Sequence, residues 1–144
     1  MRRIKQLSTT AICILAFAFT ADLTKADESL AAETEVCEAS WYGPGFQGND
    51  MANGQRFDMN DITVVAHKTL PFGTRLRVTN LDNGESIVVE VQDRGPFIAG
   101  RCVDLSRAGA IELGYYCGPR CGTARVRVEP TTEPVTDEAT SFTS

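Results

Sequence analysis

The sequence predicts a small closed β-barrel, and three observations support this fold class. Short runs rich in alternating or β-branched apolar residues dominate the folded region. Only one segment has the features of a helix. Long loops join the runs, and six short strands leave exposed edges unless the sheet closes on itself.

Six segments are expected to form the strands. The clearest pair is Thr74–Asn80 and Ser86–Asp93, because the Asn83-Gly84 sequence between them is a strong hairpin signal. The other four expected strands are Cys37–Tyr42, Ile62–His67, Arg101–Leu105 and Thr123–Glu129.

The single expected helix covers Ser106–Gly114. Ser106 is suited to the N-cap and Gly114 to the position that ends the helix. Ala108 and Ile111 are expected to pack inward, together with Leu105.

The first two strands are separated by a long segment, "GPGFQGNDMANGQRFDMND", which covers 43–61. It contains four glycines and has no sustained periodicity. Loops of this length inside a compact domain are usually functional or disordered. The segment is therefore a candidate contributor to a functional site.

The N-terminus has the layout of a secretory signal peptide. A basic start is followed by the apolar run "AICILAFAF" and then by small residues. The run is too short to span a bilayer as a helix, which takes about 20 residues. Cleavage after Ala26 is favoured over cleavage after Ala21, so 1–26 are expected to be removed. Cys13 lies too early for a lipoprotein signal, and the product is expected in the periplasm without a lipid anchor.

Charge and composition limit the partners and the domain boundaries. The whole chain carries a net charge of −5, and because the first 26 residues carry +3, the remainder carries −8. This balance argues against nucleic acid or an anionic membrane as the main partner. Residues 27–36 and 130–144 are expected to be disordered. The barrel domain is expected at 37–129, as a monomer.

Four cysteines follow the expected leader, and an even count in a small exported domain predicts disulfides. Three pairings are open, and we favour Cys102–Cys117 with Cys37–Cys121. A metal site at Cys117 and Cys121 is less favoured, because an oxidising compartment favours bridges and no matching CxxC is present. No metal or other cofactor is expected.

The stretch "SIVVEVQDRGPF" ends a strand with an acid. Alternation places Ile87, Val89, Val91 and Asp93 on one face of the strand. That apolar face should be buried, so Asp93 is expected at the rim of the core. Partial desolvation would favour the protonated form that a general acid needs. The structural alternative is an aspartate that pairs with Arg94 or caps the turn.

Several ordered motifs together resemble the rare lipoprotein A (RlpA) family of bacterial cell-wall proteins. They are "ASWYGPGFQG", "ANGQRFDMND", "AHKTLPFGTRLRVTNLDNG" and "VQDRGPFIAGRCVDLSRAGAIELG". The resemblance runs from about Ala39 to Val128 and implies a six-stranded double-psi β-barrel with one short helix. The pattern is more distantly similar to expansins and barwin-like proteins, which use the same barrel on polysaccharides.

The resemblance also implies an activity. Characterised RlpA proteins are endolytic peptidoglycan transglycosylases. They cut naked glycan strands between N-acetylmuramic acid and N-acetylglucosamine and leave 1,6-anhydro-muramic ends. A lyase that remodels the cell wall, without a cofactor, is therefore expected. Many members also carry a lipoprotein cysteine and a glycan-binding SPOR domain, neither of which is seen in this sequence.

Three residues are the expected catalytic set. Asp93 matches the aspartate of the family's DRGP motif, His67 matches its AH motif, and Asp58 matches the aspartate of the motif seen here as "ANGQRFD". Gln55 stands where active members generally place glutamate. Glutamine can bind a sugar hydroxyl, but it cannot transfer a proton. Asp93 is expected to protonate the glycosidic oxygen and then to accept a proton.

The expected substrate-binding residues are Gln55, Asn53, Trp41, Tyr42 and Arg94. Aromatic faces suit the apolar faces of sugar rings, and Phe46 lies in the same region of the chain. Arg94 either holds Asp93 or contacts a muramic lactyl carboxylate. Asp104 is expected to organise the junction between the fifth strand and the helix.

Two rival functions use the same sequence features. A non-catalytic, expansin-like glycan-binding module is favoured by Gln55. A secreted barrel that binds another protein through its acidic surface is the second rival.

Overall fold

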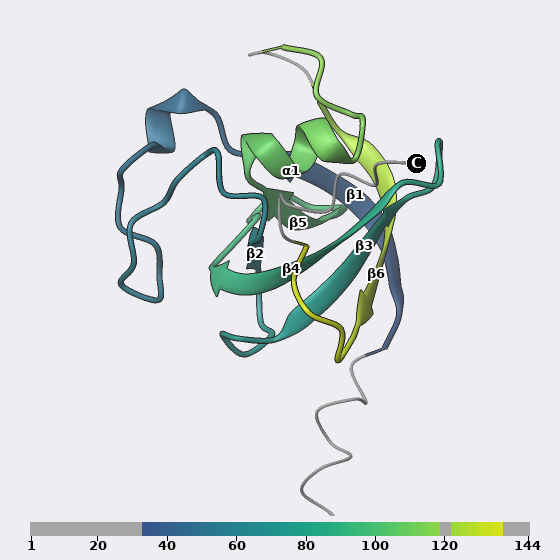
Figure 1. The fold of residues 1–144 in the computed structure, drawn as a ribbon, viewed down its shortest axis with the longest axis horizontal. Helices are drawn as coiled ribbons and strands as arrows, with labels where there is room; N and C mark the ends of the chain where they lie inside the picture. Colours follow the sequence, from purple (N-terminus) through teal and green to yellow (C-terminus); the bar gives the residue numbers. More distant parts are fainter. Residues whose placement is uncertain (1–32, 119–121, 137–144) are drawn as a thin grey trace, which may run out of the picture.

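The computed structural model describes residues 33–118 and 122–136, and these form a closed barrel of six strands (Figure 1). The order around the barrel is β1-β5-β2-β4-β3-β6. Every expected strand is present, with ends shifted by up to two residues. The strands are β1 (Glu35–Trp41), β2 (Val64–His67), β3 (Arg75–Asn80), β4 (Ser86–Asp93), β5 (Arg101–Leu105) and β6 (Ala124–Pro130).

Two of the six strand contacts are parallel, namely β1 with β5 and β2 with β4. The other four are antiparallel. The β3–β4 hairpin forms as predicted, and Gly84 in its turn has a φ of 81°, which glycine adopts without steric cost. The predicted double-psi barrel with one short helix is confirmed. Its parallel contacts join segments that are far apart in the chain.

The barrel interior is filled by the inward faces of alternating strands. Leu76 and Val78 of β3 are fully buried, as are Val89 and Val91 of β4 and Val126 of β6. These are the inward positions that alternation predicts for β3, β4 and β6. Burial of this kind stabilises the fold by roughly 1.5–3 kcal/mol for each large aliphatic side chain.

The helix α1 (Arg107–Glu112) lies over one end of the barrel (Figure 1). Ser106 is its N-cap and accepts a hydrogen bond from the backbone N–H of Gly109 at 3.0 Å, as predicted. Gly114 follows with a φ of 72°. The expectation that Ile111 packs inward is wrong, because this side chain is 48% exposed. The buried face is made by Gly109 and Ala110 instead.

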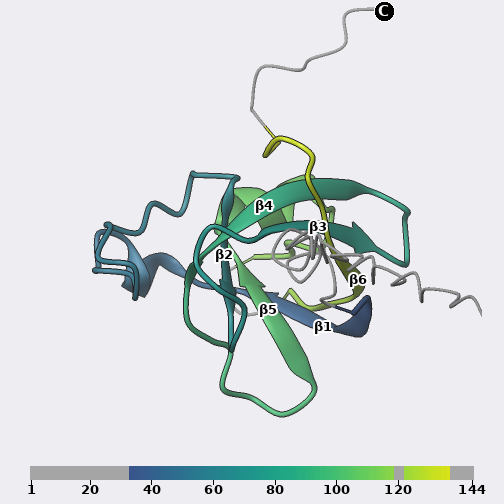
Figure 2. The ribbon, with the colours of Figure 1, turned by 90° about the horizontal axis from the view of Figure 1, so that it is seen from below.

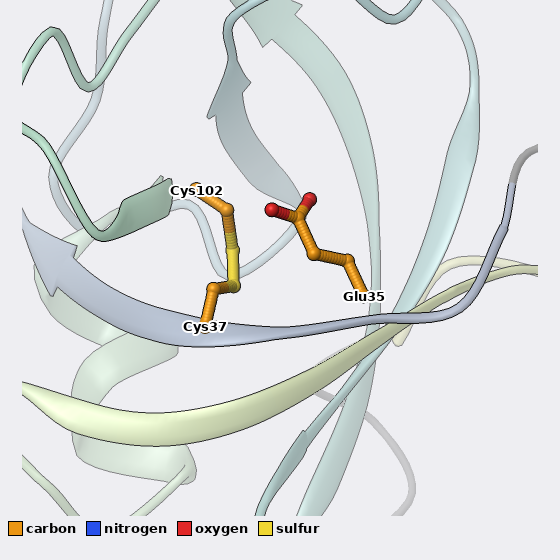
Figure 3. A group of neighbouring side chains, drawn as sticks. All are labelled: Glu35, Cys37 and Cys102. Carbon is orange, nitrogen blue, oxygen red and sulfur yellow. A yellow bond between two sulfur atoms is a disulfide. The ribbon is translucent and has the colours of Figure 1, made fainter.

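Cys37 on β1 is bonded to Cys102 on β5, and Figure 3 shows this disulfide beside Glu35. The favoured pairing, Cys102–Cys117 with Cys37–Cys121, is therefore wrong. The physical reason is the parallel contact between β1 and β5, which brings the two Cα atoms to 5.9 Å. Cys117 is also disulfide-bonded, and Cys121 lies outside the described residues.

The long segment between β1 and β2 projects to one side of the barrel (Figures 1 and 2). It begins with the short 3-10 helix η1 (Pro44–Phe46). The segment has its own small core, which packs onto the outer side of β2 and consists of Tyr42, Met51, Phe57, Val64 and Ala66. The loop is thereby fixed against the barrel wall.

The described chain after β6 contacts β3 and β4. Thr136 donates its backbone N–H to the carbonyl of Val88 at 2.8 Å, and its hydroxyl accepts the Val88 N–H at 2.7 Å. Glu133 forms an ion pair with Arg77 of β3. Residues 1–32, which include the expected leader, lie outside the described residues. Within 33–118 and 122–136, no helix reaches the length and apolarity that crossing a bilayer requires.

Replacing Cys37 and Cys102 together by alanine should lower the free energy of unfolding by about 2–4 kcal/mol. The bridge closes a loop with a sequence separation of 65, so its loss restores much conformational freedom to the unfolded chain. Urea unfolding of both proteins measures the change. Peptide mapping of the unreduced wild type should yield a Cys37–Cys102 peptide pair, and a Cys37–Cys121 pair would contradict the structure.

Candidate active site

Two irregularities in strand register bring a row of side chains together. In the β1–β5 contact, the register shifts between Glu38 and Ala39, and Cys102 is skipped. In the β2–β4 contact, the register shifts between Val65 and Ala66, and Gln92 is skipped. Such bulges re-aim the side chains that follow them.

The shifted registers form a continuous row across four neighbouring strands. Ser40 of β1 is paired with Asp104 of β5, Asp104 with Ala66 of β2, and Ala66 with Asp93 of β4. Residues that are directly paired point to the same face of a sheet. The four side chains therefore share one face, and the two acids flank Ala66.

This shared face is the outer one. Val65 and its partner Val91 belong to the barrel core, whereas Ala66 belongs to the outer cluster beneath the long loop. The expectation that Asp93 shares a face with Val91 is therefore wrong. The skipped residue, Gln92, breaks the alternation and turns Asp93 outward, where it is partly buried by the loop.

Asp93 and Asp104 both line a groove of about 310 Å³. The other lining residues include a hydroxyl, two cations and several large apolar groups, which are Ser40, Arg94, Arg101, Trp41, Tyr42, Phe46, Phe97 and Ile98. Phe97 is 83% exposed, so the groove has an apolar rim that stands in solvent. Ala66 lies between the two acids, and its small side chain leaves the groove floor open.

Strand geometry gives the spacing of the two acids. They are separated by one intervening strand, so their Cα atoms lie about 10 Å apart, which is two strand spacings. Side chains that converge from this separation can flank a single sugar ring. Both acids line the same groove from neighbouring positions of the row.

Three donors hold Asp93 in place. Its Oδ1 accepts the backbone N–H groups of Ala52 and Arg94, each at 2.8 Å. Its Oδ2 accepts the Tyr42 hydroxyl at 3.5 Å. Burial raises the pKa of the Tyr42 phenol, and the nearby Asp93 and Asp104 charges raise it further. Tyr42 therefore remains a hydrogen-bond donor to Asp93, and its ring stacks on Phe57 at 4.5 Å.

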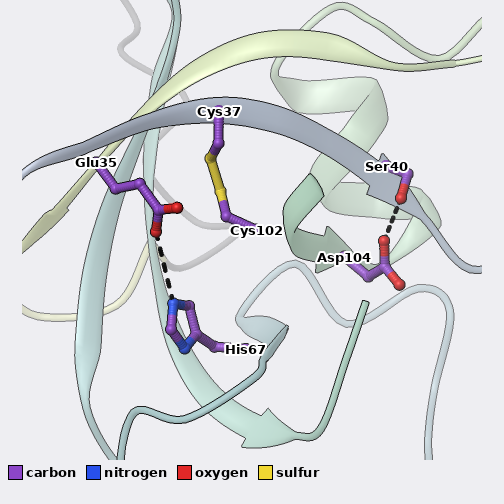
Figure 4. Close-up of a disulfide and its surroundings, with 6 residues drawn as sticks. All are labelled: Glu35, Cys37, Ser40, His67, Cys102 and Asp104. Atoms are coloured by element: carbon purple, nitrogen blue, oxygen red, sulfur yellow. Dashed lines mark hydrogen bonds and ion pairs between the residues drawn. A yellow bond between two sulfur atoms is a disulfide. The ribbon is translucent and has the colours of Figure 1, made fainter. Parts of the chain in front are cut away.

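Asp104 has a different environment. Its Oδ1 accepts the Ser40 hydroxyl (Figure 4). Burial raises the pKa of Asp104; the Ser40 hydrogen bond and the Arg101 charge oppose this rise, and the Asp93 charge adds to it. Asp104 therefore holds a proton more readily than an exposed aspartate does. The printed side-chain contact of Asp104 is with Ser40 of β1, and the strand–helix junction is capped by Ser106.

His67 is not brought together with Asp93. Its Nδ1 accepts the backbone N–H groups of Thr69 and Leu70 at 3.2 and 3.1 Å, and its Nε2 lies 4.0 Å from Glu35 (Figure 4). The ring lines a second pocket, of about 250 Å³, with Glu35 and Leu70. Burial lowers the pKa of His67. A catalytic role for His67 stays a prediction, and its contacts are those of a residue that fixes the turn after β2.

Asp58 also lies away from the groove-lining residues. Its Oδ1 accepts the Asn60 backbone N–H at 3.0 Å and the Gln47 side-chain amide at 3.3 Å. The Asn60 N–H bond is the main cause that lowers the pKa of Asp58. These contacts are within the long loop, so Asp58 has the geometry of a turn-capping residue.

Asn53 and Gln55 lie on a turn that touches Asp93. The Asn53 Oδ1 accepts the Gln55 backbone N–H at 2.9 Å, and the Gln55 carbonyl accepts the Met51 N–H at 2.7 Å. The neighbouring Ala52 N–H is bound to Asp93. The structure thus brings the "ANGQ" turn to the edge of the groove, with the Gln55 side chain exposed.

Arg94 and Trp41, for which substrate binding stays a prediction, both line the groove. The Arg94 guanidinium donates to the carbonyls of His67 and Leu70 at 3.2 and 2.8 Å, so it does not hold the Asp93 side chain. The Trp41 ring packs edge-on against Tyr116 at 4.9 Å.

Among the described residues, one group has the ligand types and spacing of a metal site. The ligand atoms of Glu35, Cys37 and Cys102 lie within 4.8 Å of one another (Figure 3). Both sulfur atoms are joined in the disulfide, so they do not present thiolates to a metal.

Comparison with protein families gives a match over residues 34–128 to the family described as lytic transglycolase. The chain belongs to the lytic transglycolase family. The resemblance to RlpA is confirmed by relatives that carry this name. The chain is 55% identical over 94 residues to the endolytic peptidoglycan transglycosylase RlpA of Pseudomonas aeruginosa, which covers 65% of this chain and 26% of that protein.

The RlpA protein of Neisseria meningitidis is 47% identical over 100 residues, which is 69% of this chain and 40% of that protein. The chain thus spans about a quarter to two fifths of these relatives. Among solved structures, the expansin of Clavibacter michiganensis matches with a TM-score of 0.53 at 23% identity, over 72% of this chain and 53% of that one. This structural similarity supports the barrel fold of the chain.

Replacing Asp104 by asparagine should raise the stability of the protein at pH 7. Burial raises the folded-state pKa of Asp104, so the folded state favours its neutral form. The penalty of ionising it in the folded state is absent below the ordinary aspartate pKa, grows as pH rises from there to the folded-state value, and is complete above it. Asparagine is neutral throughout and still accepts the Ser40 hydroxyl.

Urea unfolding at several pH values measures this effect. The stability gain of Asp104→Asn should be present at pH 7 and should shrink as pH falls toward the ordinary pKa of an aspartate, about 4. A variant that is less stable than the wild type at pH 7 would contradict the assignment.

Proposed function

We propose that this protein is an endolytic peptidoglycan transglycosylase that cleaves the bond between N-acetylmuramic acid and N-acetylglucosamine. The products carry 1,6-anhydro-muramic ends. The observation that carries the proposal is the row in which Asp104 and Asp93 flank Ala66 on the floor of an open groove. The activity in the names of the Pseudomonas and Neisseria relatives supports the same reaction.

The two acids divide the proton transfers because their environments differ. The sequence predicts Asp93 as the proton donor, but we assign this role to Asp104. Its pKa is raised by burial, and it donates its proton to the glycosidic oxygen of the leaving sugar. Asp93, which two backbone N–H groups hold, presents its carboxylate to the positive charge that develops at C1 of the muramic ring.

The second half of the reaction uses a group of the substrate. The 6-hydroxyl of the same muramic ring attacks C1, and its proton passes to the Asp93 carboxylate. The C1–O bond to the leaving sugar breaks as the internal C1–O6 bond forms. No water is added, so the reaction is an intramolecular transglycosylation and not a hydrolysis, and Asp104 recovers a proton from solvent or from Asp93.

The remaining expected residues bind or position the substrate. Tyr42 orients Asp93 through its hydroxyl, and Trp41 contributes an aromatic wall. Gln55 and Asn53 offer amide groups to sugar hydroxyls at the groove edge. His67 holds the turn that follows β2. Arg94, at the end of β4, donates a hydrogen bond to the His67 carbonyl and so links the two. In this assignment Gln55 performs no proton transfer, so the absence of a glutamate there leaves the two-aspartate chemistry in place.

We also propose that the protein acts in the periplasm, as a monomer, after removal of 1–26. The basic, apolar and small-residue order of the leader supports export. Peptidoglycan, the substrate named for the relatives, lies in that compartment.

Asp93→Asn should lower the rate of anhydro-end formation by about 10²–10⁴. Asparagine keeps the shape and the two backbone contacts, but it cannot accept the proton of the 6-hydroxyl. The test digests purified glycan strands and quantifies anhydro-muramic fragments by mass spectrometry. Asp82→Asn is the matched control, because that exposed carboxylate lies in the turn between β3 and β4, outside the groove, and it should retain nearly full activity.

The same experiment separates the rival functions. If the wild type retains glycan in a pull-down but produces no new ends, the expansin-like binding module is supported. Absence of both binding and cleavage favours a protein partner. If the wild type does not cleave glycan and the Gln55→Glu variant does, the missing family glutamate limits the reaction, and the aspartate pair does not.

Phe97→Ala should raise the KM for glycan about 5- to 20-fold with a smaller change in kcat, since burying an aromatic face against a sugar contributes about 1–2 kcal/mol. Phe97 is the most exposed large apolar side chain among the described residues, and it lines the groove. Val36→Ala, an exposed apolar truncation on β1 outside the groove, is the control. Equal effects of the two substitutions would contradict a role of Phe97 in binding.

A further inference from the structure

Among the described residues, two arginines line the groove, and the structure assigns them different roles. The Arg94 guanidinium is committed to the protein: it donates to the carbonyls of His67 and Leu70 and lies 3.9 Å from the centre of the Phe72 ring. These contacts tie the end of β4 to the turn that follows β2. Arg94 is therefore occupied in holding the barrel wall.

Arg101 has far fewer contacts. It begins β5, is half-buried, and lines the same groove. Within the described part of the chain, its side chain makes one hydrogen bond, a long one of 3.5 Å to the Ser40 hydroxyl. A guanidinium has five N–H donors in a planar fork. Most of this donor capacity is thus available to a ligand in the groove.

The position of Arg101 relative to the acids is also defined. The Ser40 hydroxyl that accepts from Arg101 donates to Asp104. The cation therefore lies two hydrogen bonds from the proposed proton donor, on the same groove wall. A ligand group that it binds must belong to the sugar at the cleavage point or to its immediate neighbour.

We propose that Arg101 binds the lactyl carboxylate of the muramic ring that is cleaved, and that this contact is the physical basis of the preference for naked glycan, with a free-acid lactyl group, that the RlpA resemblance implies. This inference rests on the proposed function. Each muramic ring carries a lactyl group on O3. That group ends in a carboxylate when no peptide is attached and in an amide when a stem peptide is attached.

The lactyl carboxylate fits Arg101 in position, in shape and in charge. The lactyl group hangs from the same ring whose C1 is attacked, so its carboxylate lies within one ring of the acids. A guanidinium fork matches the two oxygens of a carboxylate, and such charge-assisted pairs are about twice as strong as neutral hydrogen bonds. The chain is acidic overall, with a net charge of −5, so an anionic group enters the groove only where a local cation receives it.

The test compares two substrates that differ only at the lactyl group. One is glycan stripped of peptides, and the other is the same glycan with its lactyl carboxylates converted to methylamides. The wild type should cleave the free acid with a kcat/KM about 10- to 100-fold above that of the methylamide, which is the range expected for a hydrogen-bonded charge pair.

Arg101→Gln should reduce this acid-to-amide preference to about one, because glutamine keeps a hydrogen-bond donor but removes the charge. Arg101→Lys should keep an intermediate preference, since an ammonium supplies charge without the planar fork. Arg75→Gln is the matched control. Arg75 lies on β3 outside the groove, where it donates to the Glu133 carbonyl, so its loss should leave the preference unchanged.

If Arg101 acted only through the effect of its charge on Asp104, a different result would be expected. The Arg101 charge lowers the pKa of Asp104, so removing it would shift the pH–rate profile equally for both substrates. An unchanged acid-to-amide ratio in Arg101→Gln, or a wild type without a preference, would overturn the inference.

Binding measurements separate this inference from the activity. If the wild type cleaves neither substrate, the proposed function fails, and calorimetry with both glycans still tests the inference. Tighter binding of the free acid that depends on Arg101 supports it. Equal binding, or no binding, of the two glycans overturns it.

Discussion

The active-site geometry depends on one constraint, which is the shifted register in both parallel strand contacts of the barrel. Without the skipped residues, alternation would place Asp93 on the core face beside Val91, where an ionised carboxylate has no solvent. With them, Asp93, Ala66 and Asp104 fall in one row on the outer face. The long loop then covers that face and supplies the Ala52 N–H and, through Tyr42, a hydroxyl to the acid at its edge.

The row has an energetic cost that the surrounding barrel must offset. Burial disfavours the charged form of Asp104, and the Asp93 charge adds to that effect. The disulfide between β1 and β5 joins the same two strands that carry Ser40 and Asp104 (Figure 4). This covalent link lies two residues from Asp104. It stabilises the β1–β5 contact, which holds Asp104 in a position where burial disfavours its charged form. This arrangement is typical of functional sites, where strain or unfavourable burial is maintained by a rigid scaffold.

The sequence predicts the local features of this protein and misses those that depend on distant contacts. The β3–β4 hairpin and the Ser106 N-cap follow from neighbouring residues, and both are confirmed. The family motifs also single out Asp93 as a candidate site residue, and Asp93 lines the groove. The disulfide partner of Cys37 and the role of Asp104 depend on β1 pairing with β5, whose residues are about sixty positions apart in the chain. No local pattern encodes that pairing. The short segment "CVDLS" gives Asp104 the appearance of a junction residue for the same reason.

His67 shows how alternation separates neighbours in the chain. Ala66 lies in the outer row between the two acids, and His67 is the next residue of β2. Successive side chains of a strand point to opposite faces, so an imidazole one position beyond Ala66 is directed away from the groove. Its Nδ1 accepts two backbone N–H groups, which fixes the neutral ring with its proton on Nε2, toward Glu35. The backbone turn that it organises supplies the carbonyls to which Arg94 is bound. Through Arg94, His67 supports the groove wall from behind, and Arg101 remains as the groove cation with most of its donors available.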